Sequence, residues 1–412
     1  MKIPTEQYFS PASPIDSSHV FLPPAYYSSK PVAFRKMHKY AIIGIFVKLF
    51  LGSANYFAAK VMNSTCGMPL VVDTHKTKCD PPMTSFRKAF FITFCNFFSL
   101  SLTIWIFYFF RRPKLDRTPY TRRNILLVAI PGAVEACAFC LATSAQIIMA
   151  LSLAMIMKGA KVVFTALFST IMFGKKLAAF KWVAVVICVA GLAVAGSSEY
   201  MNVSKSDDNA GTILIGLSMS LASEAMFAFQ VSFDEVMYKK KHCDTTFVVG
   251  LEGIYGSILL IPVVLLAWLV VPGDQNGSYE NLPDTLYRIG QSGVIVGFLA
   301  FYILDIFVVA IADATITKYL TSVHSSLVSV GRTIVVWMLE LVLYYGASGD
   351  VAKQYGQKWD VYSPLKVAGF VIVVASIFMY DGHIKLPFLD YSTLIQKPAV
   401  ELKDDAIEIV HS

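Results

Sequence analysis

The stretch SLAMIMKGAKVVFTALFSTIMFGKK, residues 152–176, is apolar enough to cross a bilayer, yet it holds Lys158 and Lys161 in its interior. An ammonium group at the centre of a membrane helix costs about 3 kcal/mol on insertion scales. Such a side chain therefore normally faces the interior of a bundle or a water-filled cavity. Residues 152–176 thus predict a membrane helix that borders a polar space inside the protein.

The same arrangement returns in the second half of the chain. A Ser-Leu pair at Ser152 is followed by four residues and Lys158, and a second pair at Ser326 is followed by four residues and Arg332. Cations at corresponding places in two halves indicate an inverted-repeat transporter, whose site lies near the middle of the membrane. Lys161 lies one helical turn beyond Lys158 and can share its face.

The composition also favours a membrane protein. The chain has 412 residues, of which 56% are hydrophobic and only 15% charged, and its mean hydropathy is +0.58. Soluble proteins contain about 25% charged residues. The net charge of +7 does not indicate nucleic-acid binding, because the basic residues gather in alternate loops, as the positive-inside rule describes. We expect no nucleic-acid partner.

Ten apolar runs approach the roughly 20 residues that a membrane helix needs. They cover residues 40–61, 86–110, 125–144, 147–173, 178–197, 210–233, 246–271, 290–311, 318–345 and 363–381. Five runs in each half place the second half upside down relative to the first. We predict an all-α membrane protein of ten transmembrane helices in two inverted five-helix repeats. The fourth and ninth helices are the candidates for broken helices.

The runs divide the chain into four parts. Residues 1–39 hold six prolines and no apolar run, so we expect a disordered cytosolic arm. The first five-helix repeat covers 40–197 and the second covers 210–382, and residues 383–412 form a cytosolic tail.

The loops indicate the orientation. Loop 111–123 and the groups 175–181 and 239–241 are rich in Lys and Arg and lie on the side of the N-terminal arm. By the positive-inside rule that side is cytosolic, so we expect both termini there.

The opposite loops carry signs of a lumenal compartment. Glycosylation sequons begin at Asn63, Asn202 and Asn276, all three in loops on that side. Cys66 and Cys79 share one of these loops, where an oxidising lumen would allow a disulfide.

Lys158 and Arg332 are the leading candidates for substrate contact, with Lys161 behind them. A guanidinium fork and a nearby ammonium suit phosphate or carboxylate groups. Two other interpretations stay open. Glu135 and Glu252 can neutralise the cations as permanent ion pairs, or a buried carboxyl beside a cation can titrate and relay protons.

Small polar residues within the spans complete the candidate substrate site. Asn55, Ser152 and Ser326 can hydrogen-bond a ligand, although interhelical hydrogen bonds are the common alternative. The sequence contains no H-E-x-x-H or G-x-S-x-G motif and no paired metal-ligand spacing. We therefore expect no catalytic residue, no metal and no cofactor.

A set of short motifs runs through residues 40–385. They are Gly52-Ser53-x-Asn55, Lys158-Gly159-Ala160, Phe173-Gly174-Lys175-Lys176, Asp234-Glu235, Glu252-Gly253-x-Tyr255-Gly256, Arg332-Thr333 and Tyr380-x-Gly382. With these the chain resembles the drug/metabolite transporter superfamily, and within it the nucleotide-sugar-transporter-like solute carrier 35 family, nearest to its F branch. Lys158 stands where that branch has Arg, and Lys161 where it has an apolar residue.

The resemblance implies a ten-helix solute carrier of endomembranes such as the Golgi, endosomes or lysosomes. Relatives elsewhere in the family exchange nucleotide sugars for nucleoside monophosphates. In the tail, Tyr391-Ser392-Thr393-Leu394 resembles the signals that sorting adaptors read. We expect as partners a small-molecule substrate, membrane lipid, a second copy of the chain and a sorting adaptor at Tyr391.

We predict an endomembrane secondary transporter that moves a small anionic metabolite, such as a nucleotide sugar or a phosphorylated compound, by alternating access. A rival hypothesis reverses the charge of the ligand, so that Glu135, Glu252 and Asp305 bind a cationic amine or drug. A third hypothesis is a non-transporting receptor or scaffold on the same fold. An enzyme has no support in the sequence.

Overall fold

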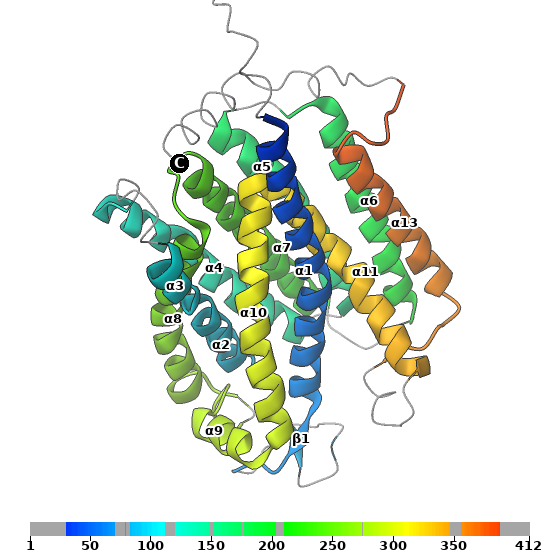
Figure 1. Cartoon of the computed structure of the whole chain (residues 1–412). Coiled ribbons are helices and arrows are strands. Elements are labelled where there is room, and N and C mark those ends of the chain that lie inside the picture. The colour runs from blue at the N-terminus through cyan, green and yellow to red at the C-terminus, as the bar shows by residue number, and fades with distance from the viewer. Residues whose placement is uncertain are drawn as a thin grey trace, which may run out of the picture.

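The computed structural model describes residues 30–70, 79, 83–111, 120–148, 151–174, 177–202, 210–273, 275–346 and 356–387. The described chain forms a bundle of long helices, with one small strand pair and one short amphipathic helix at the end opposite the start of α1 (Figure 1). The arm 1–29, the pair Lys175-Lys176 and the tail signal at Tyr391 lie outside the described residues.

The helices follow one another along the whole described chain. They are α1 (Lys30–Ser64), α2 (Ala89–Ser101), α3 (Thr103–Ile106), the π-helix η2 (Phe107–Arg111), α4 (Arg122–Ile148), α5 (Leu151–Phe173), α6 (Ala179–Asn202), α7 (Ala210–Lys239), α8 (Thr245–Leu269), α9 (Leu282–Gln291), α10 (Gly293–Tyr319), α11 (Ser322–Gly346) and α13 (Ser363–Tyr380). The strands are β1 (Cys66–Gly67) and β2 (Thr84–Ser85), which pair antiparallel.

Within the described residues, nine helical segments are long and apolar enough to cross a membrane. They include α1, α4 and the continuous segment Ala89–Arg111, which joins α2, α3 and η2. The helix α5, with its interior lysines, is not among the nine. The prediction of an all-α membrane protein is confirmed.

The expectation of broken helices is wrong for the described chain. Both α5 and α11 run without interruption, and neither contains a proline that would remove a backbone hydrogen bond. The helix α10 continues to Tyr319, past the predicted end at residue 311. Its last turns carry Asp313. This carboxylate forms an ion pair with Lys48 inside the bundle, 2.5 Å from Oδ1 to Nζ.

Glycines allow the closest helix contacts. On α8, Gly250, Gly253 and Gly256 lie along α2 and α3, as the sequence predicts for close packing. A Cβ atom at Gly253 would lie 2.1 Å from the backbone nitrogen of Ser101, and one at Gly256 would lie 2.1 Å from the ring of Phe97. These helices therefore touch backbone to backbone.

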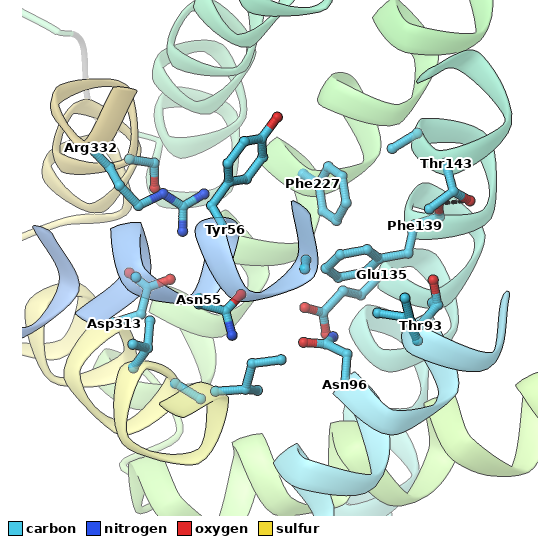
Figure 2. Close-up of a pocket in the computed structure, with 18 of the residues that line it drawn as sticks. Asn55, Tyr56, Thr93, Asn96, Glu135, Phe139, Thr143, Phe227, Asp313 and Arg332 are labelled. Carbon is cyan, nitrogen blue, oxygen red and sulfur yellow. Dashed lines mark hydrogen bonds between the residues drawn. The ribbon is translucent and has the colours of Figure 1, made fainter. Parts of the chain in front are cut away.

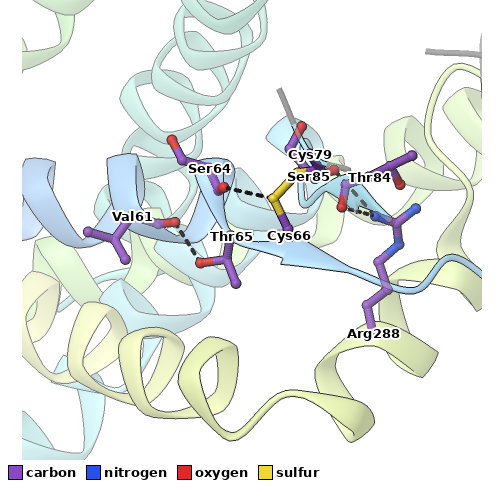
Figure 3. Close-up of a disulfide and its surroundings, with 8 residues drawn as sticks. All are labelled: Val61, Ser64, Thr65, Cys66, Cys79, Thr84, Ser85 and Arg288. Atoms are coloured by element: carbon purple, nitrogen blue, oxygen red, sulfur yellow. Dashed lines mark hydrogen bonds between the residues drawn. A yellow bond between two sulfur atoms is a disulfide. The ribbon is translucent and has the colours of Figure 1, made fainter. Parts of the chain in front are cut away.

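The strand pair and α9 lie at one end of the bundle, which we call the disulfide end. Cys66 and Cys79 are joined by a disulfide there (Figure 3). Arg288 of α9 donates hydrogen bonds to the carbonyl oxygens of Thr84, at 3.1 Å, and Ser85, at 3.3 Å. The guanidinium thus holds β2 against α9.

A buried charge network joins α2 to α9 at this end. Asp284 forms ion pairs of 2.8 Å with both Lys88 and Arg288, and it accepts a hydrogen bond of 2.8 Å from the backbone N–H of Leu70. Burial alone would raise the pKa of Asp284, but the hydrogen bonds from Lys88 and Leu70 outweigh it and hold the pKa below its ordinary value. The folded state therefore favours the ionised carboxylate.

We expect Asp284→Asn to lower the apparent melting temperature, because it leaves Lys88 and Arg288 buried without their anion. Breaking a buried pair costs about 3–5 kcal/mol. A group with a lowered folded pKa stabilises the protein above its unfolded pKa, about 3.9, and loses that contribution as the pH falls below it. The deficit should therefore be full at pH 7 and shrink towards pH 3. Asp381→Asn, in the more exposed pair with His324, is the control and should change little.

Candidate functional site

A cavity of about 970 Å³ extends from the middle of the bundle to the disulfide end. Lys48 and Asp313 line its inner part, while Cys66, Cys79 and Ser85 line it where it reaches the disulfide end. Its volume lies at the upper end of the range of sites that enclose small molecules, about 300–1,000 Å³. The cavity can therefore accept a metabolite from one side of the bundle.

Lys158 of α5 and Arg332 of α11 meet beside Tyr56 of α1. The Lys158 ammonium lies 5.0 Å from the centre of the Tyr56 ring, and both cations also line a small side pocket with Thr333. Figure 2 shows the guanidinium of Arg332 next to Tyr56. Among the described residues neither cation has an ion pair, whereas the neighbouring Lys48 does. The two predicted cations thus face the same hollow with no fixed counter-ion.

Lys161 also lines the cavity, with its ammonium 5.4 Å from the centre of the Phe227 ring. The described chain gives Lys161 no ion pair either. Glu224 of α7 is close enough for its charge to act on Lys158, Lys161 and Arg332, although it pairs with none of them directly. Lys158, Lys161 and Arg332 thus lie near Glu224, and none of the three cations forms an ion pair with a described residue.

Glu135 and Glu252 line the cavity but do not neutralise Lys158 and Arg332. Each keeps one carboxyl oxygen with no hydrogen-bond partner, and neither forms an ion pair with a described residue. The interpretation of permanent ion pairs is therefore wrong for the described part of the protein. Asp305, the third acid of the amine hypothesis, is buried in α10 and does not line this cavity.

The small polar candidates differ from one another. Asn55 lines the cavity, and its Nδ2 has no hydrogen-bond partner. Ser326 also lines it, but its hydroxyl is hydrogen-bonded across helices to Thr165, 2.9 Å between the oxygens. The backbone of Ser152 lies in α5, and its side chain lies outside the described residues. Asn55 thus lines the cavity with an amide nitrogen that is buried and lies close to Asp305 of α10.

The sequons fall at three different places. Asn63 lies near the end of α1 and lines the cavity, and Asn276 is exposed in the turn before α9. Asn202 is the last residue of α6, and its side chain is outside the described part. Their glycosylation stays a prediction.

The side of the cavity away from Arg332 is aromatic and polar. Figure 2 shows Phe139 and Phe227 there, with Glu135 beside Asn96. The two rings pack edge to face, 4.9 Å between centres. A flat ring with hydrogen-bonding edges would find stacking partners and both donors and acceptors on this side.

The cavity is closed at the end where α1 begins. Glu235 accepts hydrogen bonds from the backbone N–H of Ser322, at 2.8 Å, and from its hydroxyl, at 2.6 Å, and pairs with Lys239 at 3.0 Å. Lys239 also donates to the carbonyl of Leu320, and Lys240 donates to that of Met172 at 2.7 Å. These contacts tie the end of α7 to α11 and α5.

Sequence reasoning missed several lining residues. Tyr56, Phe227 and Gln230 lie within apolar or mixed runs that give no sign of which face they occupy. Asp313 could have been predicted from the sequence, because an acid within a long apolar run is costly unless it is paired.

Sequence matches connect this chain to known proteins. Residues 87–379 match a family described as purine nucleobase transmembrane transport. The chain belongs to this family. It is 25% identical over 230 residues to solute carrier family 35 member F6 of Mus musculus, which covers 55% of this chain and 58% of that protein.

Two further relatives extend the comparison. The chain is 24% identical over 255 residues to solute carrier family 35 member F6 of Pongo abelii, covering 61% of this chain and 65% of that protein. It is 20% identical over 312 residues to an uncharacterised protein of Schizosaccharomyces pombe, covering 72% and 87%. The resemblance to the solute carrier 35 family near its F branch is confirmed, and the match spans less than two thirds of the mouse relative's length.

Proposed function

We propose that this member of the purine nucleobase transmembrane transport family is a secondary transporter that moves a small anionic metabolite across an endomembrane by alternating access. One observation carries the proposal. Lys158 and Arg332 converge on one cavity, and neither is paired with a described carboxylate. Cations inside a membrane bundle are costly without counter-ions, and a bound anion would supply the missing partner.

The helix contacts support two inverted halves and a tenth span at α5. If α1, α2, α4, α5 and α6 correspond in order to α7, α8, α10, α11 and α13, exchanging the halves turns the packed pair α1–α10 into the packed pair α7–α4. The same exchange maps each of three other packed pairs onto itself, namely α2–α8, α5–α11 and α6–α13. Such a pattern is expected of a two-fold axis in the membrane plane, which would place Lys158 and Arg332 in equivalent positions.

The substrate that fits best carries a purine ring and an anionic group, as a nucleotide or nucleotide sugar does. Lys158 and Arg332 would bind the phosphate, and the base would pack against the Phe139–Phe227 pair. The separation of cations from aromatic rings within one cavity supports this orientation. The family description, which names purine nucleobases, supports the ring but not the charge.

The described conformation has one open and one closed end. The cavity reaches the disulfide end, while the contacts of Glu235 and Lys239 close the other. Alternating access requires these contacts to break while the disulfide end closes. We place the disulfide end in the lumen and both termini in the cytosol, as the loop charges indicate.

Counterflow into proteoliposomes tests the substrate class. We expect radiolabelled adenosine monophosphate to exchange, nucleotide sugars and phosphorylated compounds to compete, and organic amines at the same concentration to leave uptake unchanged. Competition by amines alone would favour the rival site formed by carboxyls. Absence of flux with every compound, in protein that remains monodisperse, would favour a receptor or scaffold.

A further inference from the structure

Three carboxyl groups line the cavity that Arg332 also lines. They are Glu135 of α4, Asp234 of α7 and Glu252 of α8. Asp234 is 4% exposed and Glu252 is 2% exposed. Their carboxyl groups lie within hydrogen-bonding reach of each other, and Glu135 is close enough to act on both. We call these three residues the carboxyl cluster.

The cluster is short of partners. Glu135 Oε2, Asp234 Oδ1 and Glu252 Oε1 are all buried with no hydrogen-bond partner. Among the described residues the cluster accepts from a neutral donor, the side-chain amide of Gln230, 2.5 Å from Asp234 Oδ2. Tyr238, which is 3% exposed and lines the same cavity, has a hydroxyl that makes no hydrogen bond with a described residue.

Three other acids of the spans differ from the cluster. Asp313 pairs with Lys48 at 2.5 Å, Glu340 with Lys60 at 2.7 Å, and Glu235 with Lys239 at 3.0 Å. Each of these carboxylates has a cation partner that stabilises its ionised form. Within the described structure no cation forms an ion pair with the cluster.

Few neighbouring groups carry charge that could compensate the cluster. The titratable or charged groups that act on it are Lys161 of α5, Tyr238 of α7 and Asp313 of α10. Asn96 of α2, beside Glu135, is uncharged (Figure 2). Lys161 is the single cation among these groups. Two adjacent buried carboxylates cannot both stay ionised cheaply, and one shared proton resolves both the repulsion and the missing donor.

We propose that the carboxyl cluster binds a proton and couples it to movement of the anionic substrate in the same direction. The proton passes from cavity water to a carboxyl oxygen and later returns to water on the other side, and no bond of the substrate changes. Protonation removes a negative charge from the cavity, so it favours the anion at Lys158 and Arg332. By linkage the bound anion favours the proton equally. The coupling rests on the proposed transport function, whereas the proton site does not.

Infrared difference spectroscopy of the purified full-length protein tests the proton site without transport. We expect a protonated carboxylic acid band at neutral pH that shifts in D₂O and is lost or moved in Asp234→Asn and Glu252→Gln. Glu340→Gln is the matched control, because its carboxylate is paired with Lys60, and it should keep the band. Absence of the band in the wild type, or its survival in both cluster variants, would overturn the proton site.

Proteoliposomes test the coupling. Acid on the side of the disulfide end should accelerate wild-type uptake of adenosine monophosphate, and replacing sodium by choline should not matter. Glu252→Gln imitates the protonated acid, so its uptake should lose the response to a pH gradient. Uptake that ignores the gradient, or that follows sodium instead, would contradict coupling. If no compound is transported at all, the transport proposal fails, and the infrared result still decides the proton site.

Discussion

Replacement of Arg332 by Met is expected to reduce uptake of the anionic substrate roughly 30-fold or more, while the protein still folds. Losing one partner of a buried charged contact costs about 2–5 kcal/mol, and 1.4 kcal/mol is a tenfold change. Met keeps most of the aliphatic stem that packs against Gly52, where a Cβ would lie 3.1 Å from Arg332 Cδ. The loss should therefore reflect charge and not a cavity. Lys158→Met should behave in the same way.

Two control variants make the Arg332 result specific. Arg332→Lys keeps the charge without the planar fork and should recover part of the uptake. Lys366→Met removes a buried cation of α13 that does not line the cavity and should leave uptake close to that of the wild type. Normal uptake in Arg332→Met and Lys158→Met would remove both residues from the substrate site.

The second large effect concerns folding. We expect Gly253→Ala to prevent accumulation of monodisperse protein, because the added Cβ would lie 2.1 Å from the Ser101 nitrogen and 2.5 Å from the Leu100 carbonyl carbon. Both are backbone atoms, so α2 and α8 would have to separate. Overpacking costs about 1–3 kcal/mol when side chains can adjust, and we expect more here. Size-exclusion chromatography and the apparent melting temperature measure the effect.

Gly297→Ala is the matched control for Gly253. Gly297 also lies within a membrane helix, but a Cβ there would meet nothing within 4 Å. The change should leave the protein stable, since alanine favours a helix by up to about 1 kcal/mol over glycine. If Gly253→Ala gave the same melting temperature as Gly297→Ala, the close contact of α2 and α8 would be contradicted.

The sequence predicted the parts of the site that break a strong pattern. Lys158 and Arg332 interrupt long apolar runs, and the cost of a charge in lipid indicates that both face inward. The glycines of α8 likewise follow helical spacing. Sequence alone could not show that Glu135 lies near Glu252 and forms no ion pair with Lys158 in the described structure. That outcome depends on how α4, α7 and α8 pack, and helix rotation leaves no periodic signal in runs that are apolar on every face.

The interface charges show the same limit. Asp234 and Glu235 directly follow the predicted span 210–233, and long side chains at the end of a span often extend to water. The structure buries both, and Glu235 instead accepts from the first residues of α11. A contact between residues 87 positions apart is decided by the tertiary fold. No local pattern around Glu235 encodes it.

The most direct test is the ligand-induced thermal shift of purified wild-type, Lys158→Met and Arg332→Met proteins with adenosine monophosphate, adenine and a primary amine. If the unpaired cations of the cavity bind an anion, the monophosphate should raise the melting temperature most. Either substitution should remove most of this rise. Stabilisation by the amine, or a monophosphate shift of equal size in all three proteins, would contradict the account.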